Sequence, residues 1–284
     1  MTYREARAMA VEELGRIESP SLEAELLLRH LTGWSRHIML LRLGEEMPRE
    51  LSARYLGLVR RRMSREPLQH ITGNVDFMGR EFHAGPGALV PRPETETLTD
   101  LFVRGLHDPG LLLDAGTGSG VVAVTVALTF PAALVIGSDV SREALSLAVR
   151  NRDRYGACNL LLVMGDLLQA FRPGGTALDG IVANLPYVPS REIDDLEPEV
   201  SMGDPRLALD GGDDGLDLVR EFLASAHLYM RDGGLLALEL DTEQVRPVHG
   251  MLKECGYWTS TSMHEDLTGR DRFVTARRMG TEAF

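Results

Sequence analysis

The sequence has few of the residues that stabilise secreted or metal-binding proteins. Its 284 residues include only two cysteines, Cys158 and Cys255, and eight histidines. Two distant cysteines give no disulfide framework, and the histidines show no zinc-binding spacing, so no metal site is expected. Such sparse cysteine is typical of proteins in the reducing cytoplasm.

Long apolar runs are also missing. Residues 121–130 are apolar, but this stretch is too short to cross a bilayer. Residues 1–10 are too polar and charged for a signal peptide. We therefore expect a soluble, cytoplasmic protein that does not associate with membranes.

Positive charge is in deficit. The chain has 42 acidic residues against 30 lysines and arginines, a net charge of −12 at pH 7. This balance argues against a broad, sequence-independent grip on nucleic acid, although it leaves a local basic patch open. Two common enzyme signatures are absent as well. No phosphate-binding Gly-x-x-x-x-Gly-Lys-Ser/Thr loop occurs, which disfavours ATP, and no Gly-x-Ser-x-Gly turn supports serine hydrolysis.

The chain divides into three regions that differ in their pattern of apolar residues, glycine and proline. Apolar residues recur at helical spacing up to about residue 73, with Ser21 expected to cap one helix and Pro48 to open another. Glycine, proline and alternating residues then indicate a hairpin connector over 74–93. Beyond it, strands and helices alternate, which predicts an open, mainly parallel α/β sheet. We expect strands at 111–114, 134–139, 160–164, 180–183 and 235–240, and helices at 94–106, 120–128, 143–154, 216–230 and 244–255.

A glycine loop follows the first of these strands. Gly116, Gly118 and Gly120 allow close backbone approach to a ligand, but their spacing differs from the dinucleotide fingerprint. Asp139 ends the next strand, where an acid binds ribose hydroxyls in nucleoside-binding sheets, and Asp166 follows the third. Three successive strand ends that carry a loop and two acids favour S-adenosylmethionine over NAD. The loop residues expected to contact this cofactor are Gly116, Thr117, Gly118, Ser119 and Gly120.

The fourth strand ends in Asn184-Leu185-Pro186-Tyr187. The Asn184 side-chain oxygen and the Leu185 carbonyl can each accept a hydrogen bond from a planar NH2 group, while the Tyr187 ring packs on its plane. Pro186 biases Leu185 toward an extended backbone, which holds that carbonyl in place. Beside a bound nucleoside, this turn predicts methyl transfer to an amide or amine nitrogen. We expect all four residues to be catalytic and Asn184 to contact the cofactor too.

Several longer strings resemble the protein-(glutamine-N5) methyltransferases that modify peptide chain release factors, the HemK/PrmC family. The resemblance covers nearly the whole chain. It implies an N-terminal helical domain for substrate recognition (1–73), a β-hairpin linker (74–93) and a seven-stranded, Rossmann-like class I methyltransferase domain (94–284). The substrate it implies is the glutamine of the Gly-Gly-Gln motif in class 1 release factors. The strings are EPLQHITG at 66–73, VPRPETE at 90–96, DAGTGSG at 114–120, DGGDDGL at 210–216 and DLTGRDR at 266–272.

Three positions depart from the family pattern. Leu185 stands where the family usually has proline, and the resulting tetrapeptide also resembles the one in ribosomal RNA adenine dimethyltransferases. Asp241 stands where glycine is common. Leu167 replaces a bulky ring that flanks adenine, so it offers the cofactor apolar contact without stacking. Two alternatives stay open: an adenine amino methyltransferase acting on RNA or DNA, and a non-catalytic binding module on the same scaffold.

Overall fold

The computed structural model describes residues 1–174 and 177–280, and the chain forms two compact units. One unit consists of residues 1–74 together with 197–203, and the other of residues 75–196 and 204–284. Among the helices of the described residues, none has both the length and the hydropathy needed to cross a membrane.

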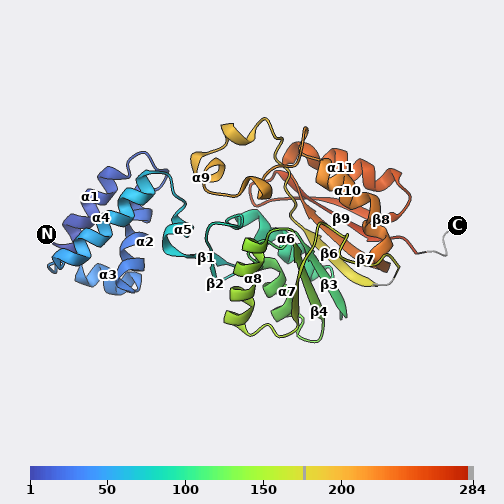
Figure 1. Cartoon of the computed structure of the whole chain (residues 1–284), viewed down its shortest axis with the longest axis horizontal. Helices are drawn as coiled ribbons and strands as arrows, with labels where there is room; N and C mark the ends of the chain where they lie inside the picture. Colours follow the sequence, from blue (N-terminus) through green and yellow to red (C-terminus); the bar gives the residue numbers. More distant parts are fainter. Residues whose placement is uncertain (175–176, 281–284) are drawn as a thin grey trace. The chain divides into compact units, whose positions relative to one another are not determined.

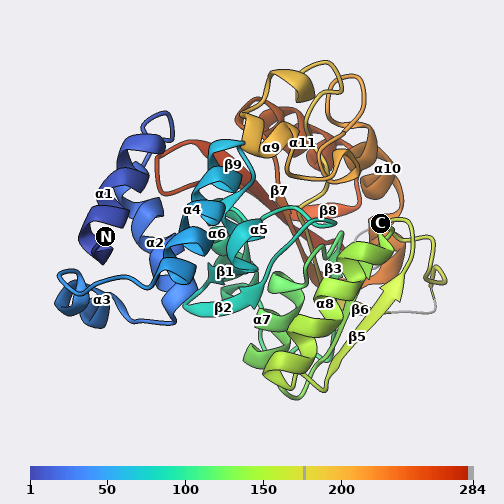
Figure 2. The same ribbon diagram turned by 60° about the vertical axis from the view of Figure 1, so that its left-hand side comes forward.

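The first unit is helical, as the sequence predicts. Helices α1, α2 and α4 lie side by side in both views (Figures 1 and 2) and enclose an apolar core that includes Leu27, Met39 and Tyr55. The Tyr55 hydroxyl donates a hydrogen bond to the carbonyl oxygen of Ala24 at 2.8 Å, which links α4 to α2. The helices are α1 (Tyr3–Glu13), α2 (Pro20–Thr32), α3 (Arg36–Arg42), α4 (Arg49–Met63), α5 (Leu68–Thr72) and, from the distant segment, α9 (Pro198–Ser201).

One predicted cap in this unit is wrong. Helix α2 begins at Pro20, so Ser21 lies inside the helix, and its hydroxyl accepts a hydrogen bond from Arg7 instead. Proline is favoured at a first helical position because its fixed φ suits the helix and its missing N–H needs no partner there. The prediction for Pro48 is confirmed, since α4 starts directly after it.

The segment 197–203 is tied to the helices by ion pairs. Glu199 lies 2.9 Å from both Arg62 and Arg65, and Arg62 also pairs with Glu23. Arg62 is buried, and a buried charge is costly unless it is paired. The two glutamates compensate its charge within the unit.

The second unit contains a seven-stranded sheet in the order β5-β4-β3-β6-β7-β9-β8. Its first five strands are parallel, and β9 runs antiparallel to both β7 and β8. All five strands expected from the pattern are present, which confirms the α/β sheet. The strands are β3 (Leu111–Ala115), β4 (Leu134–Asp139), β5 (Leu160–Met164), β6 (Leu178–Ala183), β7 (Met230–Glu239), β8 (Trp258–Glu265) and β9 (Asp271–Arg278); β1 (Asn74–Phe77) and β2 (Arg80–His83) pair separately as a hairpin.

Helices cover both faces of this sheet (Figure 1). Helices α6 (Pro93–Arg104), α7 (Val121–Thr129) and α8 (Arg142–Tyr155) lie on one face. Helices α10 (Asp217–Ala226) and α11 (Thr242–Glu254) lie on the other, with an apolar core under each layer. The helix expected over 216–230 is therefore shorter than predicted, because a 3-10 turn (His227–Tyr229) follows it and Met230 already begins β7.

The strand order reverses direction between β3 and β6. From β3 the chain adds β4 and β5 on one side, and then β6 and β7 on the other. In open parallel sheets, ligands bind at the carboxyl ends of the strands beside such a reversal. Both the glycine loop after β3 and the Asn184 turn after β6 lie there.

Candidate active site

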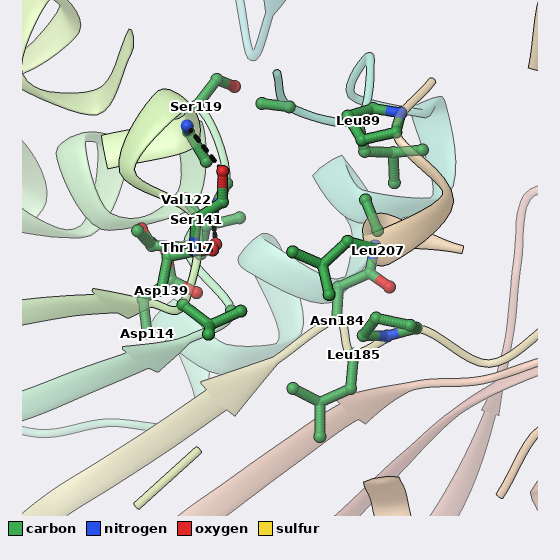
Figure 3. Close-up of a pocket in the computed structure, with 18 of the residues that line it drawn as sticks. Leu89, Asp114, Thr117, Ser119, Val122, Asp139, Ser141, Asn184, Leu185 and Leu207 are labelled. Atoms are coloured by element: carbon green, nitrogen blue, oxygen red, sulfur yellow. Dashed lines mark hydrogen bonds between the residues drawn. The ribbon is translucent and has the colours of Figure 1, made fainter. Parts of the chain in front are cut away.

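A pocket of about 340 Å³ opens at the carboxyl ends of these strands. Figure 3 shows Asp139 and Ser141 on one wall, with Asn184 and Leu207 on the opposite wall. The pocket lining includes most of the site residues expected from the sequence. They are Gly116, Thr117, Gly118, Ser119, Asp139, Asp166, Leu167, Asn184, Leu185 and Pro186.

Hydrogen bonds to the buried carboxylate of Asp114 fix the glycine loop. Its carboxylate accepts hydrogen bonds from the Thr117 hydroxyl at 2.6 Å and from the Ala123 backbone N–H at 3.0 Å. Burial raises the pKa of Asp114 to about 7, while these two hydrogen bonds act in the opposite direction. Asp114 thus fastens the loop to the start of α7. The signal for this role in the sequence is the acid that ends the strand just before the loop.

The glycines of the loop serve two different purposes. Gly116, Gly118 and Gly120 all have positive φ, between 56° and 80°. An added Cβ at Gly118 would meet no atom within 4 Å, so the backbone there is open to a ligand. An added Cβ at Gly120 would lie 2.9 Å from the Ala148 side chain on α8. Gly120 does not line the pocket, and its place in the structure is explained by the close packing of the loop against α8.

Asp139 joins the end of β4 to the glycine loop. One carboxylate oxygen accepts the Gly118 N–H at 2.8 Å, and the other accepts the Ser141 N–H at 2.8 Å. Burial raises the pKa of Asp139, and these backbone hydrogen bonds oppose the rise. A carboxylate has about four lone-pair positions, so Asp139 keeps acceptor capacity for hydroxyl groups in the pocket.

The third strand end adds Asp166 and Leu167 to the pocket wall. Leu167 has a φ of 46°, a conformation that is unusual for a leucine. Its side chain packs partly against the core beneath the sheet. Leu167 can therefore supply an apolar surface to a ligand from a fixed position.

On the wall opposite Asp139, the side chain of Asn184 is held by a hydrogen bond and that of Leu185 by apolar packing. The Asn184 side-chain NH2 donates a hydrogen bond to the Thr95 hydroxyl oxygen at 3.2 Å. The Leu185 side chain is buried in the sheet core and packs near Gly116, where an added Cβ would lie 3.2 Å from a leucine methyl group. The leucine in place of the usual proline is thus accommodated by packing of its side chain against the glycine loop.

Tyr187 does not line the pocket. Its hydroxyl accepts a hydrogen bond from the Arg272 guanidinium at 3.2 Å, and burial raises its pKa to about 12. Asp241 accepts a hydrogen bond from the same guanidinium at 3.1 Å and also caps helix α11. Asp241, which departs from the family pattern, therefore helps to hold Arg272 against Tyr187.

The glycine-rich string at 210–216 packs against the backbone of the turn. An added Cβ at Gly211 would lie 2.7 Å from the Pro186 carbonyl oxygen. Gln244 of α11 donates a hydrogen bond to the Tyr187 carbonyl oxygen at 2.8 Å. This second loop and α11 together fix the position of the turn.

These features define the class of protein. A glycine loop, two acids on the following strand ends and an Asn-x-Pro-Tyr turn, all around one pocket of a seven-stranded sheet, are those of a class I methyltransferase. The fold agrees with a solved structure of a proposed rRNA methylase from Clostridium thermocellum, which is 12% identical with a TM-score of 0.50 and covers 67% of this chain and 100% of its own.

Comparison with known sequences identifies the family. Release factor glutamine methyltransferases from Moorella thermoacetica and Deinococcus radiodurans are each 39% identical to this chain. The first match covers 98% of this chain and 99% of the relative, and the second covers 99% and 100%. Residues 5–73 match the model of the PrmC N-terminal domain, and residues 99–200 match that of the ribosomal protein L11 methyltransferase (PrmA). The chain belongs to the release factor glutamine methyltransferase family, which confirms the resemblance found in the sequence.

Proposed function

We propose that this protein methylates the side-chain amide of the glutamine in the Gly-Gly-Gln motif of class 1 peptide chain release factors, with S-adenosylmethionine as the methyl donor. The observation that carries the proposal is that one pocket joins the glycine loop to the Asn184 turn. Membership of the family supports a release factor as the protein substrate.

The pocket suits a nucleoside cofactor. Its volume of about 340 Å³ falls within the range of small-molecule sites, and its lining is largely apolar with a few polar groups. Residues 116–119 would hold the methionine and ribose portions, Asp139 the ribose hydroxyls, and Asp166 and Leu167 the adenine. When bound, S-adenosylmethionine supplies an electrophilic methyl group on a positively charged sulfur.

The Asn184 turn would activate the acceptor. An amide nitrogen is a poor nucleophile because its lone pair is delocalised into the carbonyl group. The Asn184 oxygen and the Leu185 carbonyl would each accept one N–H of the substrate amide, which orients the nitrogen and stabilises the positive charge that develops on it. Pro186 fixes the Leu185 carbonyl, and Tyr187, held by Arg272, supports the turn from outside the pocket.

The turn requires no basic catalyst. The new N–C bond would replace the methyl–sulfur bond of the donor, which would leave as neutral S-adenosylhomocysteine. The nitrogen then carries a positive charge and is strongly acidic, so its extra proton can leave to water. The residues around Asn184 therefore need only bind and orient the amide, and none of them has to accept its proton.

The helical region 1–73 would recognise the release factor, and residues 74–93 would link it to the catalytic region 94–284. The match of residues 5–73 to a family-specific domain supports a role that general methyltransferases lack. The net charge of −12 supports a protein partner over stable binding to nucleic acid. A release factor substrate would also support a cytoplasmic location for the protein.

Methyl transfer to purified substrates tests the proposal. The enzyme should label a class 1 release factor, and should not label a variant factor whose Gly-Gly-Gln glutamine is replaced by alanine. Ribosomal RNA and adenine-containing DNA serve as controls for the alternative substrate. Labelling of the nucleic acids with none of the release factor would overturn the proposal.

A further inference from the structure

Hydrogen bonds link Asn184 to Thr95, which also lines the pocket, and Thr95 to Glu239. The Asn184 side-chain NH2 donates to the Thr95 hydroxyl oxygen at 3.2 Å, and the Thr95 hydroxyl donates to the Glu239 carboxylate at 2.9 Å. The three residues come from the end of β6, the first turn of α6 and the end of β7. Thr95 and Glu239 are both buried.

The direction of this chain of hydrogen bonds is set at Glu239. Once Glu239 is ionised, above its pKa of about 7, its carboxylate can only accept hydrogen bonds, so the single hydroxyl hydrogen of Thr95 is directed to it, as the 2.9 Å hydrogen bond shows. The Thr95 oxygen then has only lone pairs to offer Asn184, and a lone pair can bind the NH2 end of the Asn184 amide but not its oxygen. The Asn184 oxygen is consequently left free for the other side.

Packing alone does not determine this orientation. The two ends of an asparagine amide are nearly equal in size, and they differ mainly in whether they donate or accept hydrogen bonds. If the NH2 end faced the pocket instead, Asn184 would present donors to the substrate amide, and its oxygen could not accept a substrate N–H.

We infer that Thr95 and Glu239 are positioning residues that act through Asn184 and select which end of its amide faces the methyl acceptor. This inference rests on the function proposed above. It gives a role to Thr95, within the VPRPETE string, and to Glu239, which is buried and does not line the pocket.

A buried carboxylate needs such an explanation because it is costly to keep. Burial raises the pKa of Glu239 to about 7, against the hydrogen bonds from Thr95 and Asn184 and the charge of Arg272. Burying a charged group carries a desolvation penalty that its contacts often fail to repay, so stability alone is weak grounds for the presence of Glu239.

The first test compares two threonines of the same helix. Thr95→Val removes the hydroxyl between Asn184 and Glu239, and we expect kcat to fall roughly tenfold to a hundredfold, with cofactor affinity unchanged. Thr95→Ser keeps the hydroxyl and should restore most of the turnover. Thr99→Val is the matched control, because the buried Thr99 hydroxyl donates only to the Thr95 backbone carbonyl at 2.7 Å. It should turn over like the wild type.

The decisive measurement repeats Thr95→Val in an Asn184→Ala background. If Thr95 acts through Asn184, its loss costs no further turnover once the Asn184 amide is gone. Glu239→Gln provides a second variant if Thr95→Val folds poorly, because the new amide can donate to the Thr95 hydroxyl and release it from its fixed direction. The loss of turnover in Glu239→Gln should likewise vanish without Asn184.

Two results would overturn the inference and leave the proposed function standing. One is wild-type turnover in both Thr95→Val and Glu239→Gln. The other is an equal fold-loss with and without Asn184, which would show that Thr95 and Glu239 merely support the fold. If the wild-type protein fails to methylate the release factor glutamine in the same assay, both the function and the inference fall.

Discussion

The two walls of the pocket are held in place by different kinds of contact. One is the proposed cofactor wall, formed by the glycine loop and Asp139, and the other is the proposed acceptor wall, formed by the Asn184 turn. On the cofactor wall, carboxylates bind groups that are near in sequence: Thr117 is three residues from Asp114, and Gly118 is 21 residues from Asp139. On the acceptor wall, the hydrogen-bond partners are distant in sequence. Thr95 is 89 residues from Asn184 and 144 residues from Glu239.

This difference suggests a division of labour. The cofactor wall is made mainly of backbone groups that a short sequence motif can shape by itself, and it suits binding. The acceptor wall places a single side chain by means of three separate elements, and it suits the precise orientation that a poor nucleophile requires. Mutations in the two walls should therefore change different kinetic quantities.

Asn184→Ala should give the largest effect. Turnover is expected to fall at least about a hundredfold, because one preorganised acceptor for the developing charge is lost. Cofactor affinity should stay nearly unchanged, since the loop and Asp139 remain intact. Single-turnover kinetics and calorimetry measure the two quantities, and wild-type turnover in this variant would remove Asn184 from the mechanism.

Asp139→Ala should show the reverse pattern. Losing a charged hydrogen-bond acceptor weakens cofactor binding by about 1–3 kcal/mol, roughly fivefold to a hundredfold. The effect includes loosening of the loop, because Asp139 also accepts the Gly118 N–H. At saturating cofactor, turnover should recover most of its wild-type value. Unchanged affinity in calorimetry would show that the ribose is held elsewhere.

The pH dependence of stability sharpens the same comparison. Glu239 has a pKa of about 7 in the folded protein against an ordinary 4.5. Between these values the folded state binds more protons than the unfolded state, so Glu239 makes the free energy of unfolding fall as the pH rises from about 4.5 to about 7. Asp114, with its pKa raised from 3.8 to about 7, acts in the same direction.

Urea unfolding at several pH values checks this expectation. Glu239→Gln should flatten the fall without abolishing it, because Asp114 still contributes. An identical pH slope in the wild type and in Glu239→Gln would show that Glu239 is ionised in the folded protein at all these pH values.

Asp241→Gly should have the smallest effect. The change restores the residue common in the family, removes a helix cap at a cost of a few tenths of a kcal/mol, and breaks the partly exposed ion pair with Arg272. Turnover should stay within about threefold, because Tyr187 keeps its bond to Arg272 and lies outside the pocket. Asp241→Asn retains the cap and separates the two contributions. A large loss of turnover in both Asp241→Gly and Asp241→Asn would instead make the ion pair essential for the turn.

The same contrast explains what the sequence predicted. The loop residues and Asp139 could be read from a local motif after a strand, and Asn184 from its turn. Thr95 and Glu239 could not be assigned roles, because their pairing depends on how α6 and β7 meet across the sheet. The residue pattern also did not predict strands β8 and β9. Most of β8 is exposed or only partly buried, so it lacks the alternation that marks a strand.

The most direct test of the account is to locate the transferred methyl group. A class 1 release factor is incubated with S-adenosylmethionine and either the wild-type protein or Asn184→Ala, and the peptide that contains Gly-Gly-Gln is fragmented in a mass spectrometer. We expect the wild type to add one methyl group to the glutamine side-chain nitrogen, and Asn184→Ala to add almost none while still binding the cofactor. A methyl group on another residue, or equal methylation by both proteins, would contradict the account.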